Sequence, residues 1–360
     1  MGEPVKRLSR VTQMVVLVAV VAGVFGVVLP RIADFDRVWA SIRSLTGWQY
    51  LVLIVVTLWN IVTYWPVVMA GLPGLTLAQA AVVNQSSTSV AMTVPAGGAV
   101  AVGVTYAMLR SWGFRRADIA LQAMVTGVWT VFVRLVFPVL ALVILVVHGD
   151  DRGAVVSAAV VGGAVLAAAS LGLGFSLWRE RFAHEVGAAA GAAVSWVRGV
   201  FGKPAVERWG DLAVRFRGQM LDLLRRRWLV LTVATVVSQT SVFVVLLASL
   251  RFVGVSETEV DWPQALAVFA VVRLASSVPI IPGNVGLAEL GYVAGLVLAG
   301  GDRAEVVAAV LVFRFLTYYA QIPLGGLTYV AWKQKRGWKK DPSPLPGPSQ
   351  EGQPAVPPSG

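Results

Sequence analysis

The sequence of 360 residues contains no cysteine and only two histidines, His148 and His184. The lack of cysteine excludes disulfide bonds, thiolate metal sites and a cysteine nucleophile. Both histidines fall in predicted loops beside charged residues, so we expect solvated side chains there rather than a metal site or a proton relay. The chain also lacks the G-x-x-x-x-G-K-[ST] motif of nucleotide-binding loops. We therefore expect neither a bound metal ion nor a cofactor.

Charged residues are scarce as well. They make up 14% of the chain, whereas 57% of the residues are hydrophobic. Several apolar runs reach about 20 residues, the length that spans the hydrocarbon core of a bilayer. The sequence thus predicts an all-α polytopic membrane protein of the cell membrane. We place spanning helices at about 12–30, 49–70, 119–147, 154–178, 228–253 and 304–332.

Acidic residues are fewer than basic ones, with 19 Asp and Glu against 30 Lys and Arg. The basic residues lie in short blocks between apolar runs, which indicates the positive-inside rule rather than nucleic-acid binding. If both termini are cytoplasmic, 21 of the 30 basic residues fall in cytoplasmic segments. This distribution favours a cytoplasmic N-terminus (1–11), a membrane domain (12–335) and a cytoplasmic tail (336–360).

Two segments outside the spans have distinct compositions. Residues 179–227 mix apolar and basic side chains at roughly helical spacing, which predicts an amphipathic segment on the anionic lipids of the inner leaflet. A linker helix that packs on the loops is the alternative. Residues 336–360 are rich in proline and almost free of apolar side chains, so we expect a disordered tail.

Two further apolar stretches, 76–109 and 264–300, are each broken near the middle by proline and glycine. A proline removes a backbone donor and clashes with the preceding turn, so each stretch is predicted to form two half-helices in a re-entrant hairpin. The breaks comprise Pro95, Gly97 and Gly98 in the first stretch and Pro279, Pro282, Gly283, Asn284 and Gly286 in the second.

The two broken stretches resemble each other. The first reads "AVVNQSSTSVAMTVPAGG" and the second "AVVRLASSVPIIPG". An arginine follows each break in an apolar segment, Arg134 at 39 residues after Pro95 and Arg314 at 35 residues after Pro279. Because the first copy starts from the cytoplasm and the second from outside, we predict an inverted repeat. Such folds place substrate sites near the bilayer midplane, where broken helices meet.

Four ionisable residues fall inside the predicted membrane segments: Arg134, Arg273, Glu289 and Arg314. Burying such a group unpaired costs at least about 2.5–3.5 kcal/mol. In one interpretation Glu289 pairs with Arg273 or Arg314, and the other arginines bond to carbonyls freed at the breaks. In the other, a phosphate-bearing ligand supplies the missing negative charge in a cavity.

At these residues the sequence resembles the lysylphosphatidylglycerol synthase transmembrane family, also described as flippase-like membrane proteins. The family motif has the form P-x-x-P-G-G-x-G-x-x-E, followed about 25 residues later by an arginine. Its positions are held here by Pro279, Pro282, Gly283, Asn284 (where the family usually has glycine), Gly286, Glu289 and Arg314. The first-half pattern is matched less fully, by Pro95, Gly97, Gly98 and Arg110.

The resemblance and the buried charges together predict a lipid translocase. Its ligand would be an anionic phospholipid, an aminoacyl-phospholipid or a polyprenyl-phosphate-linked headgroup. An intramembrane enzyme acting on lipid phosphate is one alternative, although Glu289 is the sole carboxylate in the predicted membrane segments and no paired acid and base are recognisable. An accessory subunit for a membrane glycosyltransferase, recruited through 179–227, is the other.

Overall fold

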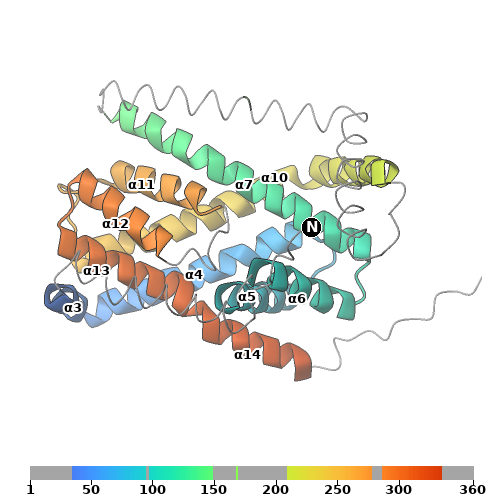
Figure 1. Cartoon of the computed structure of the whole chain (residues 1–360), viewed down its shortest axis with the longest axis horizontal. Coiled ribbons are helices and arrows are strands. Elements are labelled where there is room, and N and C mark those ends of the chain that lie inside the picture. Colours follow the sequence, from blue (N-terminus) through green and yellow to red (C-terminus); the bar gives the residue numbers. More distant parts are fainter. Residues whose placement is uncertain (1–34, 95–96, 149–167, 169–208, 278–285, 335–360) are drawn as a thin grey trace, which may run out of the picture.

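The computed structural model describes residues 35–94, 97–148, 168, 209–277 and 286–334, which form helices and contain no β-strand. The helices are α3 (Phe35–Arg43), α4 (Gly47–Gly71), α5 (Leu77–Thr93), α6 (Gly97–Ser111), α7 (Arg116–Val147), α10 (Trp209–Val253), α11 (Trp262–Ala275), α12 (Leu287–Ala299), α13 (Arg303–Arg314), the π-helix η3 (Phe315–Tyr319) and α14 (Gln321–Gln334). The all-helical prediction is therefore confirmed for this part of the chain (Figure 1).

Four helical segments among the described residues are long and apolar enough to cross a membrane. They are Gly47–Gly71, Arg116–Val147, Arg217–Val253 and Arg303–Gln334. Large apolar side chains on these segments are exposed, among them Trp48, Leu140 and Leu327, as expected of surfaces that face lipid. The predicted spans 12–30 and 154–178, and the predicted termini 1–11 and 336–360, lie outside the described residues.

The last span is less regular than predicted. Instead of one α-helix over 304–332, α13 passes into the π-helix η3 and then into α14. A π-helical turn inserts a residue into the helical repeat and is frequent at functional sites. Here it begins directly after Arg314, one of the four membrane-embedded ionisable residues.

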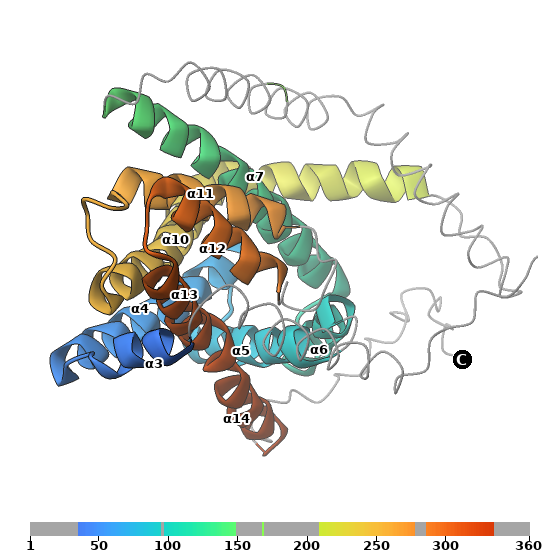
Figure 2. The same cartoon turned by 60° about the vertical axis from the view of Figure 1, so that its left-hand side comes forward.

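Each broken stretch forms a pair of packed helices, α5 with α6 and α11 with α12. Close contact is possible because glycines face the partner helix. A Cβ atom on Gly97 would lie 2.3 Å from the carbonyl oxygen of Ala91, and one on Gly295 would lie 2.6 Å from Val268. The two pairs lie at opposite ends of the bundle (Figures 1 and 2).

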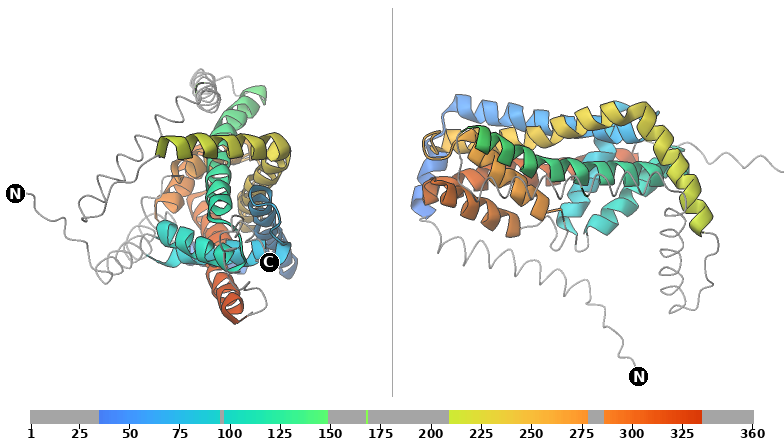
Figure 3. Two further views of the ribbon diagram at one scale, coloured as in Figure 1. Left: turned by 90° about the vertical axis from the view of Figure 1, so that its right-hand side faces the viewer. Right: turned by 90° about the horizontal axis from the view of Figure 1, so that it is seen from above.

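The two halves interlock in a matched way. Helix α4, before the first pair, packs against α10, before the second. Helix α5 packs against α14, while α11 packs against α7, so the first arm of each pair contacts a helix that follows the other pair (Figure 3). The largest cluster of buried apolar side chains comes mainly from helices α10 to α13 and includes Leu246, Phe269 and Tyr292.

Helix α10 begins at Trp209, well before the predicted span at 228. Its N-terminal part covers the described end of the predicted amphipathic segment; residues 179–208 lie outside the description. Over this part the apolar side chains Met220 and Leu223 are buried in a core with α4 and α7, while Arg225 and Arg226 are exposed. At Met220 and Leu223 this part of α10 therefore packs against protein, and contact of 179–227 with lipid stays a prediction.

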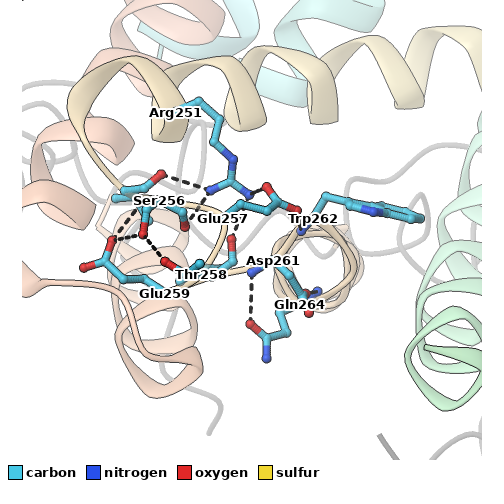
Figure 4. Close-up of polar contacts among 10 residues, drawn as sticks. Arg251, Ser256, Glu257, Thr258, Glu259, Asp261, Trp262 and Gln264 are labelled. Carbon is cyan, nitrogen blue, oxygen red and sulfur yellow. Dashed lines mark hydrogen bonds and ion pairs between the residues drawn. The ribbon is translucent and has the colours of Figure 1, made fainter. Parts of the chain in front are cut away.

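The loop between α10 and α11 is fixed by Arg251 (Figure 4). Its guanidinium donates hydrogen bonds to the carbonyls of Val255, Ser256 and Val260 and forms an ion pair with Glu257. In the same loop the Ser256 backbone and hydroxyl donate to Glu259, and these hydrogen bonds lower the pKa of the Glu259 carboxyl. The described contacts of the Arg251 guanidinium thus all lie within this loop.

We predict that Gly325→Ala destabilises the protein while Gly326→Ala does not. A Cβ atom on Gly325 would lie 2.3 Å from the carbonyl oxygen of Gln85, so α14 would be forced away from α5. Overpacking of this kind costs about 1–3 kcal/mol. At Gly326 nothing lies within 4 Å, and alanine gains helix propensity there. Thermal unfolding in detergent measures both; equal stability of the two variants would contradict the contact.

Candidate functional site

A cavity of about 260 Å³ lies between the two halves of the bundle. Both halves contribute to its wall, which contains three arginines and several polar side chains. The polar and charged residues that line it are Asn60, Tyr64, Asn84, Thr88, Arg134, Arg273, Ser276, Tyr292, Arg314, Thr317, Tyr318 and Gln321. No acidic residue is among the described residues of the wall. The cavity therefore has a positive character.

Glu289 neutralises one of the three arginines. Its Oε1 atom accepts a hydrogen bond from Arg314 Nε at 2.7 Å, and its Oε2 atom accepts one from the Gly286 backbone N–H at 2.7 Å. The Glu289 side chain is only 1% exposed. Gly286 has a φ of +89°, a conformation that glycine adopts without strain, and it caps α12. Both carboxylate oxygens are thus engaged. One caps the N-terminus of α12, and the other pairs with Arg314.

Arg314 also links the second half to the first. Its guanidinium lies 4.7 Å from the ring centre of Tyr318, at the distance of a cation–π contact. The Tyr318 hydroxyl donates a hydrogen bond of 2.9 Å to the carbonyl of Met92, at the end of α5. The π-helix therefore places Tyr318 between the Arg314 guanidinium and the first helix pair.

Arg134 and Arg273 lack such a carboxylate partner among the described residues. Arg273 Nη2 donates to Gln239 Oε1 at 2.9 Å, and Arg134 Nη1 donates to Ser277 Oγ at 3.4 Å. The Nε–H group of each is buried and has no acceptor within the described part of the chain. The two guanidinium groups are also close enough to repel each other. They leave two positive charges beside the cavity without a described counter-charge.

The structure decides between the sequence-based interpretations of the charges only in part. Glu289 pairs with Arg314, one of its two candidate partners. The described partners of Arg134 and Arg273 are neutral side chains, not carbonyls freed at the breaks. These neutral acceptors do not offset the charge, so the excess of positive charge remains in the folded structure.

The other predicted residues fall into two groups. Pro95, Pro279, Pro282, Gly283 and Asn284 lie outside the described residues. Gly97 and Gly98 are described at the start of α6. Arg110 does not line the cavity: it is exposed near the end of α6, and its Nη1 donates to the Phe114 carbonyl. Thirteen residues of helix place it about 20 Å from Gly97, too far along α6 to reach a cavity at the break.

Sequence reasoning missed several polar residues of the site. Asn60 lines the cavity and donates to Ser241 Oγ at 2.8 Å, Asn84 lines it from α5, and Gln239 holds Arg273. A signal was present, because "NQSSTS" at 84–89 and "SQTS" at 238–241 are polar runs inside apolar segments. Polar residues buried in membrane helices usually face a partner or a cavity.

A comparison with protein-family models matches residues 14–325 to the Lysylphosphatidylglycerol synthase TM region. The chain belongs to this family. The resemblance drawn from Gly286, Glu289 and Arg314 is thereby confirmed, and a lipid-related function in a membrane is consistent with it. A comparison with curated proteins finds no match.

The described positions of the family motif have distinct structural roles in this chain. Gly286 starts α12, Glu289 caps that start and holds Arg314, and Arg314 reaches the cavity wall. Arg134 and Arg273 lie outside the motif, yet they supply the charge that no described carboxylate offsets. The motif thus builds one wall of a site whose positive charge comes from elsewhere in the chain.

Proposed function

We propose that this protein binds an anionic lipid headgroup in the arginine-lined cavity and moves that lipid between the two leaflets of the cell membrane. The observation that carries this proposal is a pair of half-buried arginines, Arg134 and Arg273, whose buried Nε–H groups have no acceptor among the described residues. Charges held inside a membrane protein without a counter-charge are expensive and mark functional sites. A phosphate group would supply both the negative charge and the hydrogen-bond acceptors.

The arrangement of the helices supports movement as well as binding. The two helix pairs lie at opposite ends of the bundle, and the first arm of each contacts a helix that follows the other pair. An inverted repeat with both termini in the cytoplasm explains this arrangement. In such folds two halves rock around a fixed central site, which exposes it to each side of the membrane in turn.

The described part of the cavity wall offers no free carboxylate for chemistry on the lipid. A general base needs a free carboxylate oxygen within reach of the reacting group. Both oxygens of Glu289 are held, one by Arg314 and one by the Gly286 N–H. Conversion of a lipid phosphate or glycolipid by the purified protein would favour the enzyme alternative.

The test is lipid translocation in proteoliposomes that contain fluorescent phosphatidylglycerol or fluorescent phosphatidic acid as the probe. Arg134→Gln and Arg273→Gln each remove one charged donor, and a hydrogen bond to a charged group contributes about 1.5–3 kcal/mol. We expect each variant to slow translocation at least tenfold. Arg303→Gln, on an exposed arginine at the start of α13, is the matched control and should behave as wild type.

Two outcomes would contradict the translocase. If wild type moves no lipid faster than empty vesicles, the accessory-subunit alternative gains, and co-purification with a membrane glycosyltransferase becomes the next measurement. If wild type is active but both cavity variants are equally active, the lipid does not pass the arginine cavity.

A further inference from the structure

The charge beside the cavity can be counted. Three arginines line it, and Glu289 offsets one of them through its bond to Arg314. The segments that interrupt the two helix pairs, 95–96 and 278–285, contain no ionisable side chain and so do not change the count. The described site therefore has a net charge of about +2, carried by Arg134 and Arg273.

The same residues offer a cationic group no free carboxylate in the described part of the wall. An ammonium ion is usually recognised by a carboxylate or by the open face of an aromatic ring. Both oxygens of Glu289 are engaged. The Tyr318 ring already faces the Arg314 guanidinium, and the Phe269 ring faces that of Arg273.

The Tyr292 ring is packed against two other aromatic rings. It stacks on Phe269 with centroids 6.5 Å apart and meets Phe313 edge-on at 5.4 Å. An ammonium group in this cavity would thus meet two uncompensated guanidinium groups and no described counter-charge.

An anion with two negative charges would match the net charge of about +2 and would supply acceptors for the two Nε–H groups. A phosphate monoester carries about −1.5 to −2 charges at pH 7, because its second pKa is near 6, whereas a phosphodiester carries one. Arginine binds phosphate through two parallel N–H donors, and Arg134 and Arg273 each present a buried Nε–H without a described acceptor. Asn60, Asn84 and Gln321 line the same cavity; the amide nitrogen of each already donates one hydrogen bond and has a second N–H for a further oxygen.

We infer that the cavity selects a headgroup with two negative charges and no ammonium group, namely a phosphate monoester or a diphosphate. This inference rests on the proposed function and narrows its ligand. It favours polyprenyl phosphates and diphosphates over aminoacyl-phospholipids, because the positive site repels the ammonium groups of the latter. Monoanionic phospholipids are expected to bind more weakly.

The test is native mass spectrometry of the full-length protein with a headgroup series at equal concentration. The series contains phosphatidic acid and undecaprenyl phosphate as monoesters, phosphatidylglycerol as a monoanion, phosphatidylethanolamine as a zwitterion and lysyl-phosphatidylglycerol as a cation. We expect at least tenfold tighter binding of the monoesters than of phosphatidylglycerol. Phosphatidylethanolamine and lysyl-phosphatidylglycerol should bind more weakly than phosphatidylglycerol.

Two further readouts separate charge recognition from a structural effect. Arg273→Gln lowers the net charge of the site by one, so the preference for monoesters over phosphatidylglycerol should shrink. Between pH 5 and pH 8 the affinity of wild type for phosphatidic acid should rise, because the monoester gains its second charge near pH 6. The affinity for phosphatidylglycerol should stay constant over this range.

Competition with soluble anions identifies the source of the phosphate. Inorganic diphosphate that displaces phosphatidic acid from wild type, but only at far higher concentration, shows that a lipid-borne phosphate is recognised. If inorganic diphosphate binds as tightly as the lipids, the site still selects for charge. In that case the proposal that a lipid headgroup supplies the phosphate is overturned. If neutral diacylglycerol displaces phosphatidic acid and diphosphate does not, the protein recognises the acyl chains. That result overturns the inference.

The inference and the proposed function fail in different ways. Equal binding of phosphatidylglycerol and phosphatidic acid, still lost in Arg134→Gln, overturns the selectivity and leaves the translocase intact. Tighter binding of lysyl-phosphatidylglycerol does the same. Lipid binding that depends on neither Arg134 nor Arg273 overturns both.

Discussion

Glu289→Ala is expected to lower the free energy of unfolding by about 3–5 kcal/mol, the usual cost of removing one partner from a buried ion pair. The Arg314 side chain is 11% exposed and would lose the carboxylate with which it pairs. The Gly286 N–H at the start of α12 would lose its acceptor as well. Unfolding in a denaturant series in detergent, compared with wild type, measures the change.

A surface ion pair of similar geometry provides the control. Asp222 and Arg226 are 3.0 Å apart with exposed side chains, so Asp222→Ala should cost less than about 1 kcal/mol. The double variant Glu289→Leu with Arg314→Met removes both buried charges and should recover most of the lost stability, because apolar residues often replace a buried pair without loss. A loss below about 1 kcal/mol in Glu289→Ala would show that the pair is not a structural anchor.

Arg273→Gln is expected to have the opposite profile, with unchanged or higher stability and at least tenfold weaker lipid binding. Removing this guanidinium relieves its repulsion of Arg134 and removes a half-buried charge that no described carboxylate offsets. A glutamine can still hydrogen-bond to Gln239. Sites that bind ligands commonly sacrifice stability in this way.

Thermal unfolding with and without phosphatidic acid measures both effects at once. A ligand at a hundredfold excess over its Kd stabilises the folded protein by about 2.7 kcal/mol. We expect this stabilisation in wild type and in Arg303→Gln but not in Arg273→Gln. A variant that is less stable than wild type and equally stabilised by lipid would make Arg273 a structural residue.

Most helical spans among the described residues follow from local sequence. Segment length and hydropathy gave the spans at 49–70, 119–147 and 228–253, because a helix in lipid must satisfy its backbone groups within itself. The same constraint made the proline and glycine breaks recognisable, and each broken stretch does form two helices. The π-helix after Arg314 was not predicted, since nothing in the apolar pattern of 304–332 marks it.

The sequence by itself determined that the chain is helical, that it carries three arginines and one carboxylate in apolar segments, and that it resembles its family. Only the tertiary structure decided that Glu289 pairs with Arg314, that Arg110 lies away from the cavity, and that Asn60 meets Ser241, 181 residues away along the chain. Local composition fixes which segments can enter the membrane, because hydropathy acts residue by residue. The partner of a buried charge depends on how distant helices pack, and that packing leaves no periodic trace in the sequence.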